Sequence, residues 1–475
     1  MAEKQYIAVD LGAESGRVML GSLGDSGIQL KEIHRFANGA VRAGKTLYWD
    51  ILRLWSEIQA GIARTMDEIP AIQGIGIDTW GVDFGLVDKH GDLLGNPVHY
   101  RDSRTEGMVD EFYRRINPEK VFAITGSQTM PINTLFQLVS LGIKNPGLLA
   151  QADRLLFIPD LLGYWMTGEM RTEYTIASTS QMLDARLRQF SPEILAAAGL
   201  RESLFAPMVQ PGQKIAAVNS LSAAFAKVTG VPLLAVGSHD TASAVAAVPA
   251  QGDNWLFLSS GTWSLLGVEV QRPVLSPRAR ELNLTNEGGL DGTIRLLKNI
   301  AGLWPLQECR RAWARAGKDF EYRTLVQLAR EEPPNTALLD LNDPLMQSAG
   351  EMPQKIADHC RRRGQKAPET PGQFTRVILE SLAASYAQVR HMLEEVTGRK
   401  FTHLHIVGGG SQNELLNQLA ANATGMEVHA GPVEATAMGN IMAQALATGG
   451  ISSLAAGREL VAKTAHVRIY RPENS

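Results

Sequence analysis

Residues 6–21 form the stretch YIAVDLGAESGRVMLG, in which a short glycine-containing turn joins two apolar runs. The first run is closed by the carboxylate of Asp10, and the second begins at Val18. Apolar runs separated by a tight turn with glycine are typical of a β-hairpin. The stretch therefore predicts a hairpin near the start of the chain, with Asp10 at the end of its first strand.

The hairpin pattern recurs in the second half of the chain, where WLFL at 255–258 and LLGV at 265–268 flank the tip SSGTWS. Each half also contains a strand that leads through a turn into a helix, at 233–240 and at 403–410. Strands that alternate with helices indicate an α/β fold, and the repetition indicates that the fold is duplicated. We expect the joint near 245–254, with an N-terminal domain over 1–245 and a C-terminal domain over 246–475.

The spacing of apolar residues predicts several further elements. Leucine and isoleucine at helical spacing predict helices over 49–67 and over 374–397. We also expect a strand pair formed by 75–78 and 84–87. The triple glycine at 408–410 should lead into a helix that has Ser411 as its N-cap.

The composition excludes several classes of protein. A length of 475 residues predicts about two to four domains, at about 100–200 residues each. Lys and Arg number 46 against 49 Asp and Glu, so a net charge of -3 gives no field that would attract nucleic acid or anionic lipid. Two cysteines cannot build a disulfide framework or a cysteine-rich zinc site. The charged start (residues 1–5) contains no signal core, and no apolar stretch of about 18 residues occurs, so we expect a soluble, reduced, cytoplasmic protein.

Glycine-rich turns are the strongest chemical lead. Phosphate oxygens bind where successive backbone N–H groups converge, and residues without side chains permit that approach. The tip at 12–17 adds the hydroxyl of Ser15 and the guanidinium of Arg17, and the tip at 259–264 adds Ser260 and Thr262. One such tip alone is typical of an ordinary turn, whereas two tips from duplicated halves can hold a polyphosphate between domains.

The triple glycine at 408–410 is open to two interpretations. It is a candidate nucleotide site at the end of a strand, and it is equally a tight strand–helix turn. Neither a complete G-x-G-x-x-G fingerprint at this turn nor a G-x-x-x-x-G-K-[ST] motif anywhere is present in the sequence. The absence of the second motif excludes a P-loop nucleotide enzyme.

Carboxylates follow several of the predicted strands. Asp10 can hold Mg²⁺ or accept hydrogen bonds from the hairpin tip, and Asp78 occupies a similar strand end. In the cluster SHDT at 238–241, Asp240 is either a helix N-cap or a general base whose carboxylate accepts a hydroxyl proton. The residue types alone leave both roles open.

Two loops combine aromatic and charged residues, at 78–84 and 100–104. Together they can line a polyol pocket, where an aromatic face and bidentate side chains meet hydroxyl groups. Taken separately, Trp80 is more typical of a core residue. Arg101 and Arg104 are more typical of a surface ion pair with Asp102.

Basic residues and histidines carry little chemical signal. The basic run at 359–366 is expected to be a solvated linker, because acidic residues flank it. Metal-ligand spacing is missing for His34, His90, His391 and His466. His403 and His405 should point to one packed face of a strand.

Over essentially its whole length the sequence resembles the FGGY carbohydrate kinases, members of the sugar kinase, actin and heat-shock ATPase superfamily. The motifs that carry the resemblance are VDLGAESGRVML at 9–20, GIGIDTWGVDFGLVD at 74–88, YRDSRT at 100–105, SHDTASAV at 238–245, SSGTWSL at 259–265, LTNEGG at 284–289, LKNIAGLWPLQE at 297–308, HIVGGGSQNELLNQL at 405–419 and GPVEATAMGN at 431–440. DTWGVDF, YRDSRT and SHDTASA are closer to the members that act on L-rhamnulose than to glycerol, xylulose or gluconate kinases.

The resemblance implies two duplicated ribonuclease-H-like domains of the actin-like ATPase type, with a catalytic cleft between them. It implies transfer of the γ-phosphate of ATP to the 1-hydroxyl of L-rhamnulose, with Mg²⁺ held by Asp10. By motif match, Asp240 is the base that takes the hydroxyl proton. The sugar would be held by Gly81, His239, Asp240 and Thr241, and ATP by Ala13, Glu14, Ser15, Gly16, Arg17, Thr262, Asn299, Gln307 and Gly409. Glu14 departs from the small polar residue common in the family and places a negative charge near the phosphates.

Other functions remain open at this point. A kinase for another ketose such as L-fuculose would differ only in pocket side chains. An actin-like ATPase without kinase activity would share the architecture but lack a base aimed at a hydroxyl acceptor. A dinucleotide oxidoreductase is the least favoured, because its fingerprint is missing. The expected partners are a small sugar and ATP, with neither nucleic acid nor membrane, for a monomer or a homodimer.

Overall fold

The predicted first hairpin is present. In the computed structural model, β1 (Lys4–Leu11) pairs antiparallel with β2 (Ser15–Gly24), and the register brings Asp10 opposite Arg17. The structure describes residues 3–219, 223–334 and 337–473, so the first two residues of the charged start lie outside it. Apolar residues of β1 from Tyr6 to Val9 are fully buried, which explains why this stretch forms a central strand.

The chain forms two compact units. Unit 1 comprises Met1–Pro249, Glu269–Leu296 and Ala435–Ala465. Unit 2 comprises Ala250–Val268, Leu297–Glu434 and His466–Ser475. The chain first passes from unit 1 to unit 2 after Pro249, and two later segments return to unit 1. The two-unit α/β fold that the sequence predicts is confirmed, and the continuous domain bounds 1–245 and 246–475 stay a prediction.

A six-stranded sheet forms the centre of unit 1, in the order β13-β14-β6-β1-β2-β3. Strand β6 runs parallel to β1, so Asp78 of β6 lies beside Asp10 of β1. The strands of unit 1 are β1 (Lys4–Leu11), β2 (Ser15–Gly24), β3 (Gly27–Ala37), β4 (Ala40–Ala43), β5 (Thr46–Trp49), β6 (Ile75–Thr79), β7 (Phe84–Val87), β8 (Arg154–Phe157), β9 (Thr172–Glu173), β10 (Leu183–Asp184), β11 (Gln189–Phe190), β12 (Met208–Val209), β13 (Lys214–Ala217), β14 (Pro232–Leu234) and β17 (Thr285–Gly288).

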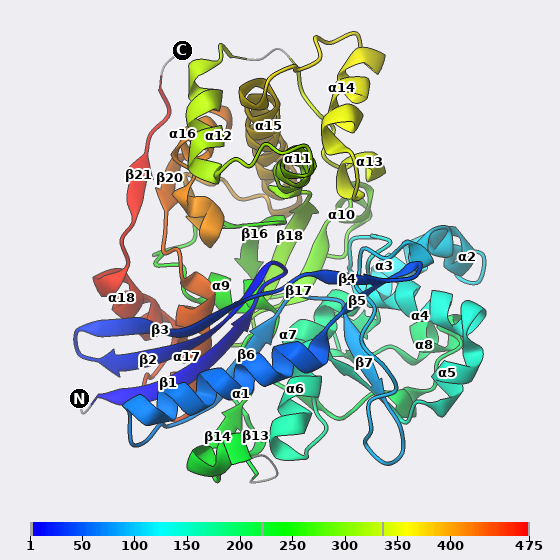
Figure 1. Cartoon of the computed structure of the whole chain (residues 1–475), viewed down its shortest axis with the longest axis vertical. Coiled ribbons are helices and arrows are strands. Elements are labelled where there is room, and N and C mark those ends of the chain that lie inside the picture. The colour runs from blue at the N-terminus through cyan, green and yellow to red at the C-terminus, as the bar shows by residue number, and fades with distance from the viewer. Residues whose placement is uncertain (1–2, 220–222, 335–336, 474–475) are drawn as a thin grey trace. The chain divides into compact units, whose positions relative to one another are not determined.

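Helices from distant parts of the sequence cover this sheet. In Figure 1, α17, drawn in orange, lies beside β1 and β2, and α18, drawn in red, lies beside β3. The helices of unit 1 are α1 (Ile51–Glu68), α2 (Met108–Tyr113), α3 (Pro118–Thr125), α4 (Thr134–Lys144), α5 (Pro146–Gln151), α6 (Ile158–Thr167), α7 (Tyr174–Ala177), α8 (Pro192–Ala198), α9 (Asp240–Ala246), α10 (Pro277–Glu281), α17 (Ala435–Ala447) and α18 (Leu454–Thr464). The predicted helix over 49–67 is α1, whose N-cap is Asp50.

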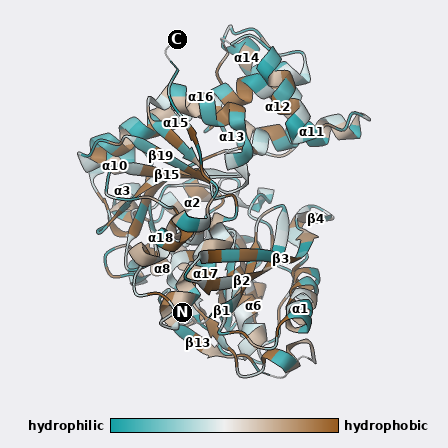
Figure 2. Cartoon of the chain, turned by 90° about the vertical axis from the view of Figure 1, so that its left-hand side faces the viewer, coloured by the Kyte–Doolittle hydropathy of each residue, from teal (hydrophilic) through white to brown (hydrophobic). Residues whose placement is uncertain are grey.

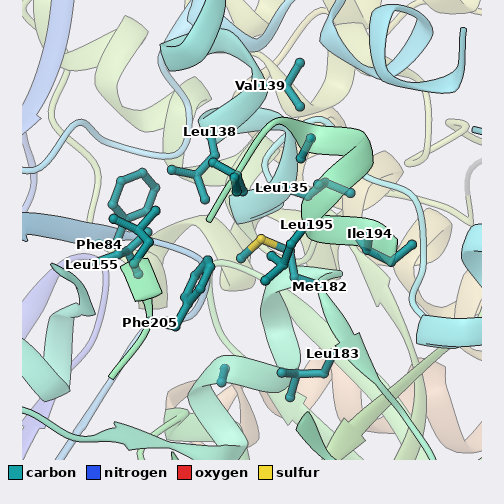
Figure 3. Packing of buried hydrophobic residues seen from close by; sticks show 14 of the residues in the cluster. Phe84, Leu135, Leu138, Val139, Leu155, Met182, Leu183, Ile194, Leu195 and Phe205 are labelled. Carbon is teal, nitrogen blue, oxygen red and sulfur yellow. The ribbon is translucent and has the colours of Figure 1, made fainter. Parts of the chain in front are cut away.

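A second apolar cluster in unit 1 packs beside the main sheet. Phe84, Leu155 and Phe205 come together on one side of it, and Leu135, Met182 and Leu195 fill its centre, as Figure 3 shows. Phe84 and Leu155 come from β7 and β8, Leu135 and Leu195 from α4 and α8, and Met182 and Phe205 from connecting segments. The cluster explains a difference from the prediction that 75–78 and 84–87 pair with each other: β7 pairs with β8, and β6 pairs with β1 and β14.

Unit 2 repeats the arrangement of the first hairpin. Strand β15 (Trp255–Ser260) pairs antiparallel with β16 (Ser264–Val270) and parallel with β19 (His403–Val407), as β1 pairs with β2 and β6. Strand β19 then pairs with β20 (Glu427–Ala430), and β20 with β21 (Arg468–Tyr470). The division between the units falls within β16 and within β18 (Ile294–Ile300).

The helices of unit 2 each bury one side. In Figure 2, the colours along α14 therefore alternate between hydrophilic and hydrophobic residues. They are α11 (Trp304–Arg315), α12 (Tyr322–Glu331), α13 (Pro344–Gln347), α14 (Met352–Arg362), α15 (Pro371–Thr397) and α16 (Glu414–Thr424). The predicted helix over 374–397 is α15, which ends at Gly398 with a φ of 68°. None of the described helices combines the length and the apolar character needed to cross a membrane.

Two local predictions in unit 2 are wrong. Part of the basic run at 359–366 belongs to α14, where His359 and Cys360 are buried while the neighbouring arginines are exposed. The N-cap of α16 is Asn413, whose side chain accepts a hydrogen bond from the backbone N–H of Leu416, and not Ser411. Ser411 instead donates its hydroxyl to the carbonyl of Gly408 at 2.7 Å, inside a 3-10 turn over Gly409–Gln412.

Candidate active site

Three aspartates lie at the ends of neighbouring chain segments in unit 1. Asp10 of β1 and Asp78 of β6 are direct neighbours in the parallel register. The segment that precedes α9 lies next to the end of β6, because the backbone N–H of Thr79 donates to the carbonyl of Ser238 at 2.9 Å. Asp240 begins α9 two residues later. The fold therefore gathers at one edge of the sheet three carboxylates that are far apart in sequence.

Asp10 is bound by the guanidinium predicted to contact phosphate. Its Oδ2 accepts from Nη2 of Arg17 at 2.5 Å, and the carboxylate is 4% exposed. The hairpin tip is closed without Asp10, because the N–H of Gly12 donates to the carbonyl of Ser15 at 2.9 Å. The interpretation that Asp10 accepts a hydrogen bond from the tip is confirmed, with Arg17 of the tip as the donor.

The remaining residues of the tip differ in accessibility. Ala13 and Ser15 are half-buried, and Glu14 is exposed. Gly16 is buried, and a Cβ there would lie 2.2 Å from the ring of Phe36, so its glycine is required by packing. We infer that the tip offers residues 13–15 to a ligand more readily than Gly16.

Asp78 is a buried carboxylate with one oxygen unsatisfied. Its Oδ2 accepts from Nδ2 of Asn440 at 2.6 Å, whereas Oδ1 has no hydrogen-bond partner among the described residues. Burial, and then the nearby charge of Asp10, raise the pKa of Asp78 well above its usual range. A group in this state stabilises any cation that replaces the missing donor.

Asp240 is half-buried and occupies the first turn of α9. The helix begins at Asp240 with His239 in the N-cap position, so the interpretation of Asp240 as a plain N-cap is wrong. Oδ1 accepts from the backbone N–H of Thr241 at 2.6 Å and from its hydroxyl at 3.2 Å. The side chain stays 30% exposed. Burial raises the pKa of Asp240, the charge of His239 opposes that shift, and Asp10 adds to it.

His239 is held from behind by a buried ion pair. Its Nδ1 lies 3.1 Å from Oε2 of Glu287 and 3.1 Å from Nη2 of Arg295. Those two residues contact each other at 3.1 Å, and Arg295 is fully buried. The opposite ring nitrogen, Nε2, lies 3.5 Å from Oδ1 of Asp240. The ion pair thus fixes the orientation of an imidazole that faces Asp240.

Gly81 lies against Thr179, where a Cβ on the glycine would approach the threonine side chain at 3.2 Å. Beside it, Trp80 donates from Nε1 to Oδ2 of Asp83 at 3.1 Å and is 5% exposed, which favours the core interpretation of this tryptophan. Asp83 also accepts from Nε1 of Trp49 at 2.6 Å, and burial raises the pKa of Asp83 to about 6.

The predicted surface ion pair at 101–104 is wrong. The guanidinium of Arg104 donates to Oε1 of Gln137 at 2.6 Å and is largely buried. Asp102 accepts backbone N–H groups, from Leu47 at 2.8 Å and from Arg104 at 2.9 Å. Arg101 lies over the ring of Tyr100, with 5.2 Å from its guanidinium carbon to the ring centroid.

Unit 2 brings together part of the predicted nucleotide set. Nε2 of Gln307 donates to Oγ1 of Thr262 at 3.1 Å. The backbone carbonyls of Gly261 and Thr262 accept from the first residues of α11, at 3.0 and 3.2 Å. This contact joins the tip of the second hairpin to the start of the helix that carries Gln307.

The triple glycine contacts the same tip. A Cβ on Gly410 would lie 2.0 Å from Oγ of Ser260, so the backbone of this turn passes directly over the tip. Gly409 is exposed, and a Cβ there would meet no atom within 4 Å. Asn299 lies half-buried near the end of β18. Next to it, burial lowers the pKa of Lys298 to about 8.

Sequence reasoning missed Glu287, Arg295 and Asn440 as site residues. The motifs LTNEGG and GPVEATAMGN contain Glu287 and Asn440, but nothing local connects them with Asp78 or His239. A charged Arg295 inside the apolar run of β18 was a usable signal, because a buried arginine requires a partner.

Comparison with known families gives matches in both halves of the chain. The N-terminal domain of the FGGY family of carbohydrate kinases matches residues 5–247. The C-terminal domain of the same family matches residues 256–448.

Several curated proteins that are similar over the full length are rhamnulokinases. A rhamnulokinase of Bacteroides thetaiotaomicron is 45% identical, over 99% of this chain and 96% of that protein. A rhamnulokinase of Enterococcus faecalis is 40% identical, over 99% and 94% of the two chains. A rhamnulokinase of Bacillus subtilis is 36% identical, over 99% and 96%.

Solved structures share the fold at much lower identity. A gluconate kinase from Lactobacillus acidophilus has a TM-score of 0.79 at 15% identity, covering 99% of this chain and 94% of that one. A glycerol kinase of Plasmodium falciparum, solved with ADP, has a TM-score of 0.78 at 15% identity with the same coverage. These structures confirm the two-unit α/β architecture expected from the sequence.

Proposed function

Because the chain belongs to the FGGY family of carbohydrate kinases, we propose that it transfers the γ-phosphate of ATP to the 1-hydroxyl of L-rhamnulose. The products are L-rhamnulose 1-phosphate and ADP. The name shared by relatives that are 36% to 45% identical over nearly the whole chain supports this sugar over other ketoses. The observation that carries the proposal is the half-exposed Asp240, fixed at a strand end beside two further carboxylates.

Asp240 is the proposed general base. Oδ1 already accepts two hydrogen bonds from Thr241, so we assign Oδ2 to the sugar hydroxyl. The hydroxyl oxygen attacks the γ-phosphorus, the bond from that phosphorus to the ADP oxygen breaks, and the hydroxyl proton passes to Asp240. A raised pKa suits this role, because it makes the carboxylate a stronger proton acceptor.

Sugar binding is assigned to residues around the base. Gly81, His239 and Thr241 lie on segments that converge at the same sheet edge, and the ring of His239 is oriented by Glu287. A neutral polyol is recognised by hydrogen bonds, so an imidazole with one nitrogen already fixed is well suited to it.

The nucleotide is assigned to two groups of residues. In unit 1, the backbone of the tip at 13–17 would contact phosphate oxygens, with Ala13 and Ser15 half-buried and Glu14 exposed. In unit 2, the assigned residues are Thr262, Asn299, Gln307 and Gly409. The bond between Thr262 and Gln307 and the bare backbone of Gly409 support this assignment.

Asp10 and Asp78 fit a Mg²⁺ ion. Both offer hard carboxylate oxygens, and Oδ1 of Asp78 is buried without a hydrogen-bond donor among the described residues. The ion would supply charge neutralisation at the transferred phosphate. Arg17 keeps one oxygen of Asp10 oriented, so this chain would bind the ion through the second oxygen or through water.

The decisive test measures ADP release from the full chain with L-rhamnulose, L-fuculose, D-xylulose and glycerol in turn, with the variant Asp240→Asn as control. We expect release to rise strongly only with L-rhamnulose. Asp240→Asn should lower kcat by about 10²–10⁴-fold while ATP still binds. A larger rise with L-fuculose would overturn the sugar assignment and retain the kinase. Equal ADP release without any sugar would favour an actin-like ATPase.

A further inference from the structure

Three potential metal ligands face one another on two neighbouring strands of unit 2. His403 of β19 and Glu427 and His429 of β20 each offer one ligand atom, and these atoms all lie within 4.8 Å of one another. The parallel register pairs His403 with Glu427 and His405 with His429. Since residues two apart on a strand share a face, the three side chains project from the same side of the sheet.

The contacts of Glu427 orient it toward its neighbour. Oε1 lies 2.9 Å from Nε2 of His429, and Oε2 accepts from Nε of Arg471 at 2.9 Å. The arginine therefore occupies the outer oxygen and leaves the inner one directed at the histidine. Two donor atoms 2.9 Å apart subtend about 90° at an ion that binds each at about 2.05 Å, a possible angle for a metal site.

Thr402, the residue before His403, orients the imidazole of His403 for metal binding. Its Nδ1 lies 2.8 Å from Oγ1 of Thr402, and that hydroxyl lies 3.4 Å from the carbonyl of Asn254. If the hydroxyl donates to the carbonyl, it accepts from Nδ1–H of the imidazole. The lone pair of His403 then resides on Nε2, as in metal-binding histidines whose second nitrogen is held by an outer partner.

The wall behind the cluster is aromatic. His405 is 5% exposed, its ring centroid lies 4.8 Å from that of His429, and it packs at 5.8 Å against Trp255. His429 and Glu427 are themselves only 22% and 27% exposed. Such a surround restricts the side chains to few rotamers, so less conformational freedom is lost when an ion binds.

We propose that His403, Glu427 and His429 form a binding site for a divalent transition-metal ion of the zinc or nickel class. Two imidazoles and one carboxylate suit these ions, whereas Mg²⁺ prefers oxygen ligands alone. The ion would replace the hydrogen bond between His429 and Glu427 and would join β19 to β20 through side chains. Its role would be structural, because none of the three residues belongs to the proposed kinase machinery.

The test is a calorimetric titration of the metal-free full chain with ZnCl₂, repeated with MgCl₂. We expect one zinc ion per chain, no displacement by Mg²⁺, and a rise in the melting temperature. His403→Gln, His429→Gln and Glu427→Gln should each weaken zinc binding by at least about 10–100-fold, which is the loss caused by removing an outer partner of a ligand. The matched control is His391→Gln, which removes a histidine whose side chain is 73% exposed and outside the cluster.

Two results would overturn the site. One is parent-like zinc affinity in both His403→Gln and His429→Gln, and the other is equal loss of affinity in His391→Gln. The melting temperature of each metal-free variant shows whether it folds. If one histidine variant fails to fold, Glu427→Gln, which keeps the shape of the side chain, decides the question.

Discussion

Asn440 donates its side-chain N–H to Oδ2 of Asp78 at 2.6 Å, although 362 positions separate the two residues in the chain. Asn440 is itself fixed by Gln444, whose Nε2 donates to its Oδ1 at 2.7 Å and to the carbonyl of Ile7 at 2.8 Å. Gly76 makes this approach possible, because a Cβ there would lie 2.4 Å from Oδ1 of Asn440. A late helix of unit 1 thus positions a carboxylate of its first sheet.

Asp78→Asn should make the protein more stable and less active. The buried carboxylate has a raised pKa, so the folded state is penalised while Asp78 is charged, and the penalty declines as pH falls through the folded-state pKa. Removing the charge should raise the free energy of unfolding at neutral pH by about 0.5–2 kcal/mol. If Asp78 helps to bind Mg²⁺, kcat should fall more than about tenfold.

Urea unfolding of parent and Asp78→Asn at several pH values checks this expectation. The stability difference should shrink toward acid, where the parent carboxyl binds its own proton. A difference that stays constant with pH would show that packing, and not charge, separates the two proteins.

The activity should decline in acid at a higher pH than an ordinary aspartate would dictate. Asp240 must be ionised to accept a proton, and burial raises its pKa above the usual value of about 3.9. Lowering the pH through that raised pKa removes the base, so kcat falls. Thr241→Val deletes a hydroxyl that donates to Oδ1 of the carboxylate, and should shift the acidic limb further upward.

The measurement is kcat against pH with saturating sugar and ATP. Asp240→Asn serves as the control, since its residual rate should lack this limb. An acidic limb near pH 4 in the parent, unmoved in Thr241→Val, would contradict the role of Asp240.

Glu287→Gln should destabilise unit 1 and weaken sugar binding. It leaves the fully buried guanidinium of Arg295 without its counter-charge, which costs about 3–5 kcal/mol when one partner of a buried pair is removed. It also releases His239, so KM for the sugar should rise more than KM for ATP. Urea unfolding and the two KM values provide the readout.

A double variant separates the two effects of Glu287. Glu287→Gln with Arg295→Met removes both charges and should recover part of the lost stability. Recovery of stability without recovery of the sugar KM would support the positioning role. Recovery of both would assign Glu287 to stability alone.

Both cysteines should be unreactive in the folded protein. Cys309 and Cys360 are buried, and burial raises the pKa of each thiol, so little thiolate is present at neutral pH. A disulfide reagent that reports thiols by colour should detect none in the native chain and two after denaturation in guanidinium. Rapid reaction of a thiol without denaturant would show that its helix opens readily.

Local patterns were sufficient for the elements that depend on neighbouring residues. Both hairpins and α15 follow from apolar spacing and from turn or stop glycines such as Gly398. Local patterns were insufficient where contacts between residues far apart in the sequence decide which strands pair. Strand β7 follows β6 but pairs with β8, because Phe84 of β7 and Leu155 of β8 pack into the second apolar cluster of unit 1, which no local pattern predicts.

The candidate site divides in the same way. Strand-end position made Asp10 and Asp240 candidate site residues from the sequence alone. Their neighbours Asp78 and His239 have partners from elsewhere, because Asn440 and Glu287 lie on segments that return to unit 1 after passing through unit 2. A single sequence carries no signal of such pairings, because the interaction depends on the completed sheet.

The three-segment composition of unit 1 has a consequence for how the protein is made. Its last segment, Ala435–Ala465, carries the helix that holds Asp78. A ribosome releases this segment only after most of unit 2 has emerged. Domains at the start of a chain usually mature first during translation, but we expect unit 1 to complete its folding late. Until Ala435–Ala465 has been made, the surface of the first sheet that α17 covers has no helix to pack against.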